Sequence, residues 1–206
     1  MSLTKTRPNH TTFPRPGAMI ETILDESSDG RPNRSEAADY YFTYIDQVPA
    51  GHICDTLGRQ LDSSRALYGA ITPAESSFSY APGKWSIADT LTHISDAERV
   101  FAFRAWWFAR GVDAPLPGFD QNVIAEAARH AGRSWSRSLD EFCAVRMATL
   151  ALFQSLPVAA WTRRGSAAGN TFSVRALAWI VAGHVAHHNR LLRERYVTLL
   201  PGDTTR

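Results

Sequence analysis

Apolar residues recur at steps of three and four positions along four long segments of the chain, which is the spacing of amphipathic α-helices. A shorter helical pattern begins at Ser35 and ends where residues 48–51 bring a proline and a glycine. The first long segment follows at once, and its regularly spaced apolar positions are Ile53, Leu57, Leu61 and Leu67. No convincing alternation of apolar and polar residues, which would indicate a half-buried strand, appears along the chain.

The second long helix has clear start and end signals. Ser86 can accept a hydrogen bond from the backbone three residues on, and Asp89 can reach back, so we predict a capping box there. The helix ends before Gly111, which is placed for a left-handed C-terminal cap. Residues 113–120 contain two prolines and a glycine and predict a loop, and a short helix is expected over residues 122–129.

The third and fourth long helices are separated by a glycine-containing turn. Ser138 and Glu141 predict a second capping box, and the helix that they start ends at Pro157. Residues 163–170 include two glycines and predict a hairpin or an open turn. The fourth long helix then runs over about residues 173–196.

Four long amphipathic helices with short extra helices predict an all-α four-helix bundle. The chain has 206 residues, 44% of them hydrophobic and 20% charged, which is enough for one well-buried core and a single domain. We place the bundle at residues 35–200, after an N-terminal arm of residues 1–34 and before a tail of residues 201–206. The arm has little periodicity, and its apolar patch at residues 18–24 can pack on the bundle or on a second subunit.

The charge, the cysteine content and the apolar stretches of the chain argue against several classes of protein. The 22 basic and 20 acidic side chains leave a formal net charge of +2, so no nucleic-acid partner is expected. Cys54 and Cys143 lie within helical patterns and predict two reduced thiols. The most apolar stretch, residues 176–186, is shorter than the roughly 18 residues of a membrane span, and the first residues lack the apolar stretch of a signal peptide. No membrane partner is expected, and a cytoplasmic location follows by elimination.

Two histidines of the fourth helix face the predicted core. At about 100° per residue, His184 and His188 fall about 40° apart within the apolar sector, whereas His187 lies roughly 85° from its centre. The apolar residues of that sector are Leu177, Ile180, Val181, Leu191 and Leu192. Imidazoles four residues apart on one helix can reach the same ion, so the pair is a candidate for metal binding. The competing interpretation is a buried pair that hydrogen-bonds to carbonyls or water.

A third histidine, His93, stands near the edge of the inward sector of the second long helix. Taken alone, a histidine at such a position is more often a surface or capping residue than a ligand. Three imidazoles from two helices, with one position left for water, would give the open coordination of a reactive ion. We therefore predict one divalent metal on His93, His184 and His188, with zinc first and nickel or iron(II) as alternatives. The remaining histidines, His10, His52 and His130, lie in poorly patterned places and are not assigned to the site.

At this point the chain resembles the DinB-like superfamily of bacterial metal-binding four-helix bundles, which includes bacillithiol transferases. The resemblance spans about residues 44–196. It is carried by the motifs APGKWS (81–86), HISDAER (93–99), FRA (103–105), PLPGFD (115–120), WTRRG (161–165), AGH with a second histidine four residues on (182–188) and RERY (193–196). It implies a metal on His93, His184 and His188, an up-up-down-down order of the helices and a homodimer.

Three functions remain open, all acting on or holding a small molecule or an ion. The leading hypothesis is a transferase in which the metal lowers the pKa of a low-molecular-weight thiol co-substrate and presents the thiolate to an electrophile. The second is a hydrolase that uses metal-bound water, and the third is a non-catalytic metal-binding stress protein. Asp89 and Asp96 flank His93 by one turn, but they are better explained as a capping residue and an exposed charge. No residue is assigned as a catalytic acid or base.

One acidic residue of the second long helix is unusual. Glu98 projects into the inward sector about 140° from His93, so it is not expected to share the same ion. A buried carboxylate needs a partner of opposite charge, and Arg104 and Arg99 are the arginines available on the same helix. A buried pair with an arginine is therefore expected, and the sequence does not assign it to either of these two residues.

Overall fold

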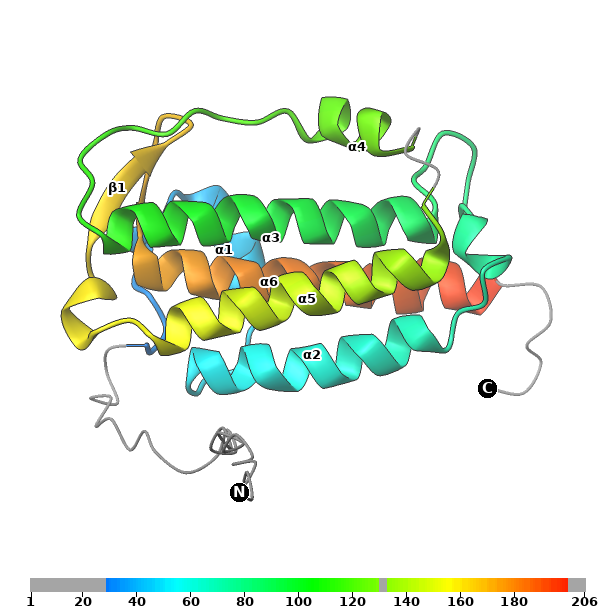
Figure 1. Ribbon diagram of the computed structural model, residues 1–206, viewed down its shortest axis with the longest axis horizontal. Coiled ribbons are helices and arrows are strands. Elements are labelled where there is room, and N and C mark those ends of the chain that lie inside the picture. The colour runs from blue at the N-terminus through cyan, green and yellow to red at the C-terminus, as the bar shows by residue number, and fades with distance from the viewer. Residues whose placement is uncertain (1–28, 130–132, 200–206) are drawn as a thin grey trace, which may run out of the picture.

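The computed structural model describes residues 29–129 and 133–199, and most of them are helical (Figure 1). The four long helices are α2 (Ile53–Gly69), α3 (Ile87–Ala109), α5 (Trp135–Gln154) and α6 (Val174–Leu191). They pack side by side with α3 and α2 at opposite corners, so the predicted all-α four-helix bundle is confirmed. None of the helices in these ranges is long and apolar enough to cross a bilayer.

The directions of the four helices differ from the expected up-up-down-down order. Gln60 donates to the carbonyl of Ala182 at 2.9 Å, and Asn189 donates to Ser64 at 2.8 Å, so α2 and α6 run in the same direction. Helices α3 and α5 both run the opposite way, which gives the order up-down-down-up (Figure 1).

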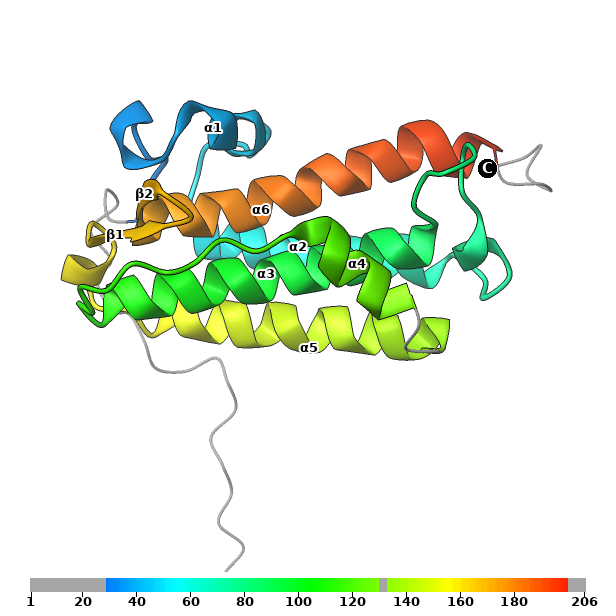
Figure 2. The same cartoon turned by 90° about the horizontal axis from the view of Figure 1, so that it is seen from above.

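The connections explain this correction. Residues 70–86, which join α2 to α3, stay at one end of the bundle and contain the short 3₁₀ helix Glu75–Ser77, so α3 must return antiparallel to α2. Residues 110–129, which follow α3, travel back along the length of the bundle and carry α4 (Gln121–Arg129) over α3 (Figure 2). Only this second connection places successive long helices parallel. The short helix predicted over residues 122–129 is confirmed as α4.

The predicted hairpin before the fourth helix is present. Strands β1 (Arg164–Ala167) and β2 (Asn170–Ser173) pair antiparallel, with Gly169 in the left-handed region at φ +75°. A Cβ atom at Gly165 would lie 2.0 Å from the ring of Phe108, so only glycine lets this strand lie against α3. After α5 the short 3₁₀ helix Val158–Ala160 leads into the hairpin.

The capping signals hold for α3 but not for α5. Asp89 N–H donates to Ser86 Oγ at 3.0 Å and Ser86 N–H donates to the Asp89 carboxylate at 2.9 Å, so the predicted box is confirmed. The box predicted at Ser138 is wrong, because α5 begins one turn earlier at Trp135. The Trp135 indole is buried and donates to the carbonyl of Ile71 at 2.8 Å, which anchors that earlier turn to the body of the protein.

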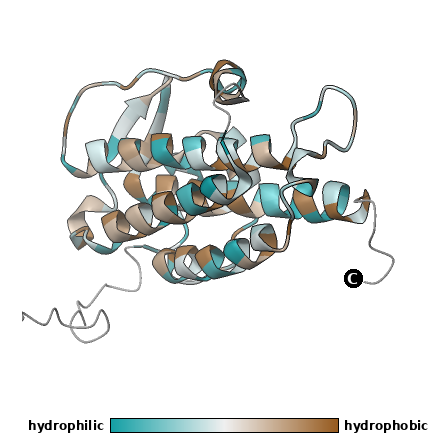
Figure 3. Ribbon diagram, turned by 45° about the vertical axis from the view of Figure 1, so that its right-hand side comes forward, coloured by the Kyte–Doolittle hydropathy of each residue, from teal (hydrophilic) through white to brown (hydrophobic). Residues whose placement is uncertain are grey.

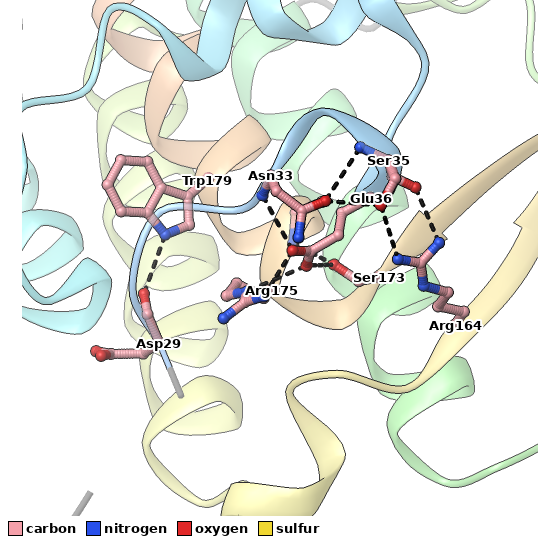
Figure 4. A network of polar contacts seen from close by, with 9 residues as sticks. Asp29, Asn33, Ser35, Glu36, Arg164, Ser173, Arg175 and Trp179 are labelled. Carbon is pink, nitrogen blue, oxygen red and sulfur yellow. Dashed lines mark hydrogen bonds and ion pairs between the residues drawn. The ribbon is translucent and has the colours of Figure 1, made fainter. Parts of the chain in front are cut away.

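The segment before α2 packs against α6. The 3₁₀ helix Arg34–Glu36 precedes α1 (Asp39–Ile45), and a network of polar contacts joins it to the start of α6 (Figure 4). Glu36 accepts hydrogen bonds from Arg175 at 2.6 Å and Ser173 at 2.7 Å, and the indole of Trp179 donates to the carbonyl of Asp29 at 3.0 Å. Residues 29–36 therefore belong physically to the bundle. The apolar patch of the arm at residues 18–24 lies outside the described residues.

Helix α6 is the centre of the structure. Every residue from 176 to 185 is buried, because α1, α2 and α3 pack around it. The hydropathy colouring shows apolar and polar residues alternating along the long helices (Figure 3). A Cβ atom at Gly183 would lie 2.2 Å from the carbonyl oxygen of Tyr44, so α1 crosses α6 in close contact one residue before His184. After α6 the chain continues as a π-helical turn, Leu192–Tyr196, and a 3₁₀ turn, Val197–Leu199.

Candidate metal centre

The structure brings the three predicted histidines together. His93 on α3 and His184 on α6 place their Nε2 atoms 3.1 Å apart, and the Nε2 atoms of His184 and His188 lie 3.2 Å apart. One possible ligand atom from each ring lies within 4.8 Å of the other two. Among the described residues this group contains neither a carboxylate nor a thiol. It is a donor set of three imidazoles, and their role as metal ligands stays a prediction.

Aromatic rings surround and orient the histidines. The ring of Trp85, just before α3, lies 4.7 Å from the His93 ring, centroid to centroid. Tyr44 on α1 meets His184 edge-on at 5.4 Å, and Phe101 approaches the same ring at 6.2 Å. The close crossing of α1 over Gly183 sets the position of Tyr44. These ring contacts restrict the rotation of the imidazoles.

Burial keeps the three imidazoles neutral. It lowers the pKa of His93 to about 4, and burial together with His93 and His187 lowers the pKa of His188 to about 3. The pKa of His184 is well below its usual value because of burial, with further contributions from the neighbouring histidines and Arg146. Neutral imidazole is the form that binds a metal.

The arrangement fits a metal ion. Ligands at about 2.0–2.1 Å from a tetrahedral zinc lie about 3.3 Å apart, close to the two separations of the Nε2 atoms. Three neutral imidazoles at these distances can hydrogen-bond to one another through their Nε2–H tautomers, or all three can turn an unprotonated Nε2 toward one divalent cation. Because the rings are neutral, a cation in the cluster has no imidazolium charge to displace. The two thiols are not part of this cluster, and burial followed by Asp29 and Asp55 raises the pKa of Cys54 to about 12.

A pocket of about 230 Å³ opens beside His188. Its other lining residues come from the segment before α3, from the first turn of α3 and from the end of α6 with the following turn: Tyr80, Gly83, Lys84, Trp85, Thr90, Leu191, Arg195 and Tyr196. The Tyr196 hydroxyl donates to the carbonyl of Trp85 at 3.0 Å, which ties the two walls together. Lys84 and Arg195 give the pocket positive charge, and no carboxylate lines it among the described residues. The sequence motifs APGKWS and RERY meet here.

The expected buried pair of Glu98 with an arginine is confirmed, but the partner is neither Arg104 nor Arg99. Arg146 on α5 binds the Glu98 carboxylate through Nε at 2.8 Å and Nη2 at 2.7 Å, and both side chains are buried. Arg104 and Arg99 are engaged elsewhere: Arg104 donates to the carbonyl of Pro117, and Arg99 pairs with acidic side chains at the surface. The signal for Arg146 was its place on the inward face of α5, one turn after the buried Phe142.

The other histidines lie outside the cluster of three. His187 is half-buried, and its Nδ1 lies 3.4 Å from the side-chain nitrogen of Gln47, in agreement with its angle on the helix. His52 pairs with Asp29 at 3.0 Å. His10 and His130 lie outside the described residues.

Comparisons with known proteins agree with the fold. The family model of the DinB superfamily matches residues 56–192, which is more than half of the chain. Among solved structures, YfiT from Bacillus subtilis, described as a probable metal-dependent hydrolase with an unusual four-helix bundle topology, aligns with a TM-score of 0.55 and 16% identity over 79% of this chain and 91% of its own. No curated protein matches. The match of the family model over the bundle and the three histidines shows that this chain belongs to the DinB superfamily.

Proposed function

We propose that the protein is a metal-dependent enzyme that transfers a low-molecular-weight thiol to an electrophile. The observation that supports this reaction is the position of the histidine cluster at the edge of a positively charged pocket without carboxylates. A thiol whose pKa is lowered needs no general base beside it. A water nucleophile reacts faster when a general base lies beside it, and no acidic side chain lines this pocket in the described part of the chain.

Each part of the pocket has a role in this proposal. His93, His184 and His188 hold one divalent metal, zinc in the first instance with nickel or iron(II) as alternatives. When bound, the metal lowers the pKa of a thiol that enters the open side. Lys84 and Arg195 attract the carboxylates that small cellular thiols commonly carry.

The reaction balances without an oxidant or a reductant. The thiol loses its proton to solvent, its sulfur forms a bond to an electrophilic carbon, and the leaving group departs with its electron pair. Trp85 and Tyr196 form apolar walls that can hold the electrophile next to His188. Neither Cys54 nor Cys143 takes part.

Hydrolysis is the second candidate, because YfiT is described as a probable metal-dependent hydrolase. The same three histidines would then hold the metal that activates water. A third candidate is a stress protein that binds the metal without catalysis, and one assay distinguishes it from the transferase and the hydrolase.

The test is an assay of metal-loaded protein with a panel of thiols and the chromogenic electrophile 1-chloro-2,4-dinitrobenzene, beside ester and amide probes. Thiol-dependent turnover above the uncatalysed rate supports the transferase. Turnover of the ester or amide without thiol supports the hydrolase, and no turnover supports the non-catalytic binder. The double variant Cys54→Ala, Cys143→Ala is expected to keep full activity, and its inactivity would contradict metal activation of an external thiol.

Two charge variants refine the assay. Arg195→Gln is expected to raise the KM for a thiol that carries carboxylates and to change the KM for cysteamine, which carries none, much less. Arg190→Gln is the matched control, because Arg190 lies on α6 near the pocket but pairs with Glu194 at the surface. Equal effects of the two substitutions on the KM would show that the charge of Arg195 does not take part in recognition of the thiol.

A further inference from the structure

A second pocket of about 300 Å³ lies along a different stretch of α3 and shares no lining residue with the pocket beside His188. Its lining residues come from two segments, α3 and the loop after it: Arg99, Val100, Phe103 and Arg104, and Leu116, Pro117, Gly118 and Phe119. The two sequence motifs FRA and PLPGFD therefore meet in this pocket. The metal centre gives no role to either of them.

The loop wall of the pocket is fixed in place. Leu116 N–H donates to the carbonyl of Ser166 at 2.9 Å, and Ala168 N–H donates to the carbonyl of Leu116 at 3.0 Å, so the loop is bound to the hairpin. The indole of Trp107 on α3 also donates to the carbonyl of Ala114 at 3.1 Å. With both walls held by hydrogen bonds, the pocket is a built feature of the fold.

Arg104 is the unusual member of this pocket. The residue is only 3% exposed, its Nη2 donates to the carbonyl of Pro117 at 3.2 Å, and its guanidinium lies 5.9 Å from the ring centroids of Phe101 and Phe119. Its side chain also hydrogen-bonds to the hydroxyl of Tyr41, which is a neutral partner. None of the ion pairs found among the described residues includes Arg104. Burying a cation without a partner of opposite charge is costly, so this side chain calls for an anion.

The other buried or half-buried arginines of the described chain have such a partner. Arg146 is paired with Glu98, and Arg175 with Glu36. Arg99, which also lines the second pocket, is already paired with Asp96 and Glu141. The charge that the pocket offers to a ligand therefore comes from Arg104.

The lining selects the class of ligand. Apart from the two arginines, every lining residue is apolar or glycine. One planar guanidinium matches one carboxylate, whereas a phosphate dianion would need further donors that this lining lacks. The volume is at the lower end of the range for small-molecule pockets. We propose that this second pocket binds a small monocarboxylate with an apolar chain or ring, whose carboxylate pairs with Arg104.

The test compares 3-phenylpropanoate with 3-phenylpropanol, which differ only at the carboxylate, by isothermal titration calorimetry. We expect the carboxylate to bind at least about tenfold more tightly, because the alcohol lacks the negative charge that pairs with the buried cation. Arg104→Gln is expected to weaken carboxylate binding by at least about tenfold and to leave alcohol binding unchanged. Arg104→Lys keeps the charge but loses the paired geometry and should fall between the two.

Two controls make the outcome decisive. Arg110→Gln removes an exposed arginine of the same region that does not line the pocket, and it should leave binding unchanged. Because a carboxylate can also bind a metal, His184→Ala is titrated in parallel and should still bind 3-phenylpropanoate. Equal binding of acid and alcohol, undiminished binding by Arg104→Gln, or loss of binding in His184→Ala alone would each overturn the proposal.

Discussion

The guanidinium of Arg146 lies at 0% exposure and donates to the carboxylate of Glu98, to the side-chain oxygen of Gln60 at 3.0 Å and to the carbonyl of Leu57 at 3.5 Å. Gln60 in turn donates to the carbonyl of Ala182, two residues before His184. A polar network thus joins α2, α3, α5 and α6 beneath the histidine cluster. A buried ion pair of this kind contributes little net stability against an apolar alternative, but the loss of one partner leaves a charge stranded in the core.

We therefore expect Glu98→Gln to lower the free energy of unfolding by about 3–5 kcal/mol, measured by chemical denaturation. The exposed pair of Arg190 and Glu194 provides the control, and Glu194→Gln should cost less than about 1 kcal/mol. The double variant Glu98→Gln, Arg146→Met removes both charges and should recover part of the loss. A double variant less stable than Glu98→Gln would mean that the pair does not act as a unit.

At the scale of elements, the crossing of α1 over α6 depends on Gly183. Because a Cβ atom there would lie 2.2 Å from the Tyr44 carbonyl, Gly183→Ala must push α1 away, at an expected cost of about 1–3 kcal/mol. Gly58→Ala on α2 is the matched control: its Cβ would meet only Leu150 at 4.0 Å, and the better helix propensity of alanine should stabilise the protein by up to about 1 kcal/mol. Thermal unfolding of both variants checks the contrast, and equal shifts in Tm would argue against the close crossing.

The docking of the 3₁₀ helix Arg34–Glu36 onto α6 makes stability depend on pH. Burial alone would raise the pKa of Glu36, but hydrogen bonds from Arg175, Ser173 and the Asn33 backbone outweigh it and hold the pKa below its usual 4.5. A carboxylate whose pKa is lower in the folded than in the unfolded protein stabilises the fold at pH values above its unfolded-state pKa. This stabilisation is lost as the pH falls through its folded-state pKa. The difference in Tm between wild type and Glu36→Gln should therefore be largest near pH 7 and shrink below about pH 4.5. A difference independent of pH would show that the charge of Glu36 is not the source.

Some features of the helices can be predicted from the sequence alone, and others cannot. The four long helices, the Ser86 cap and the inward direction of His184 and His188 follow from local rules, because the period of a helix is fixed by its backbone. The order of the helix directions does not follow from local rules, because it depends on whether a connection folds back at one end or travels along the bundle. The pairing of Glu98 with Arg146 depends on how two helices are rotated against each other, and periodicity on one helix carries no information about that.

For the molecule as a whole, the three histidines join α3 to the C-terminal half of α6, and a bound metal would cross-link these helices. An ion that binds only the folded state adds stability by mass action, about 4 kcal/mol when its free concentration is 1,000 times Kd. For a chain of this length that corresponds to a rise in Tm of roughly 10 °C. Purified protein should therefore contain one transition-metal ion per chain, and chelation should lower its Tm by an amount of this order.

The histidine variants show whether this stabilisation comes from the cluster. His184→Ala should abolish stoichiometric metal binding and with it the response of Tm to chelator, because two imidazoles on different helices are left. His187→Ala replaces the neighbour of His188 in the sequence, which lies outside the cluster. This variant should keep the metal and the response of Tm to chelator. Metal content by elemental analysis and Tm with and without chelator are measured on the same samples. Protein that holds no stoichiometric metal, with a Tm that neither chelator nor His184→Ala changes, would leave the cluster as a buried hydrogen-bonded group and remove the basis of the proposed reaction.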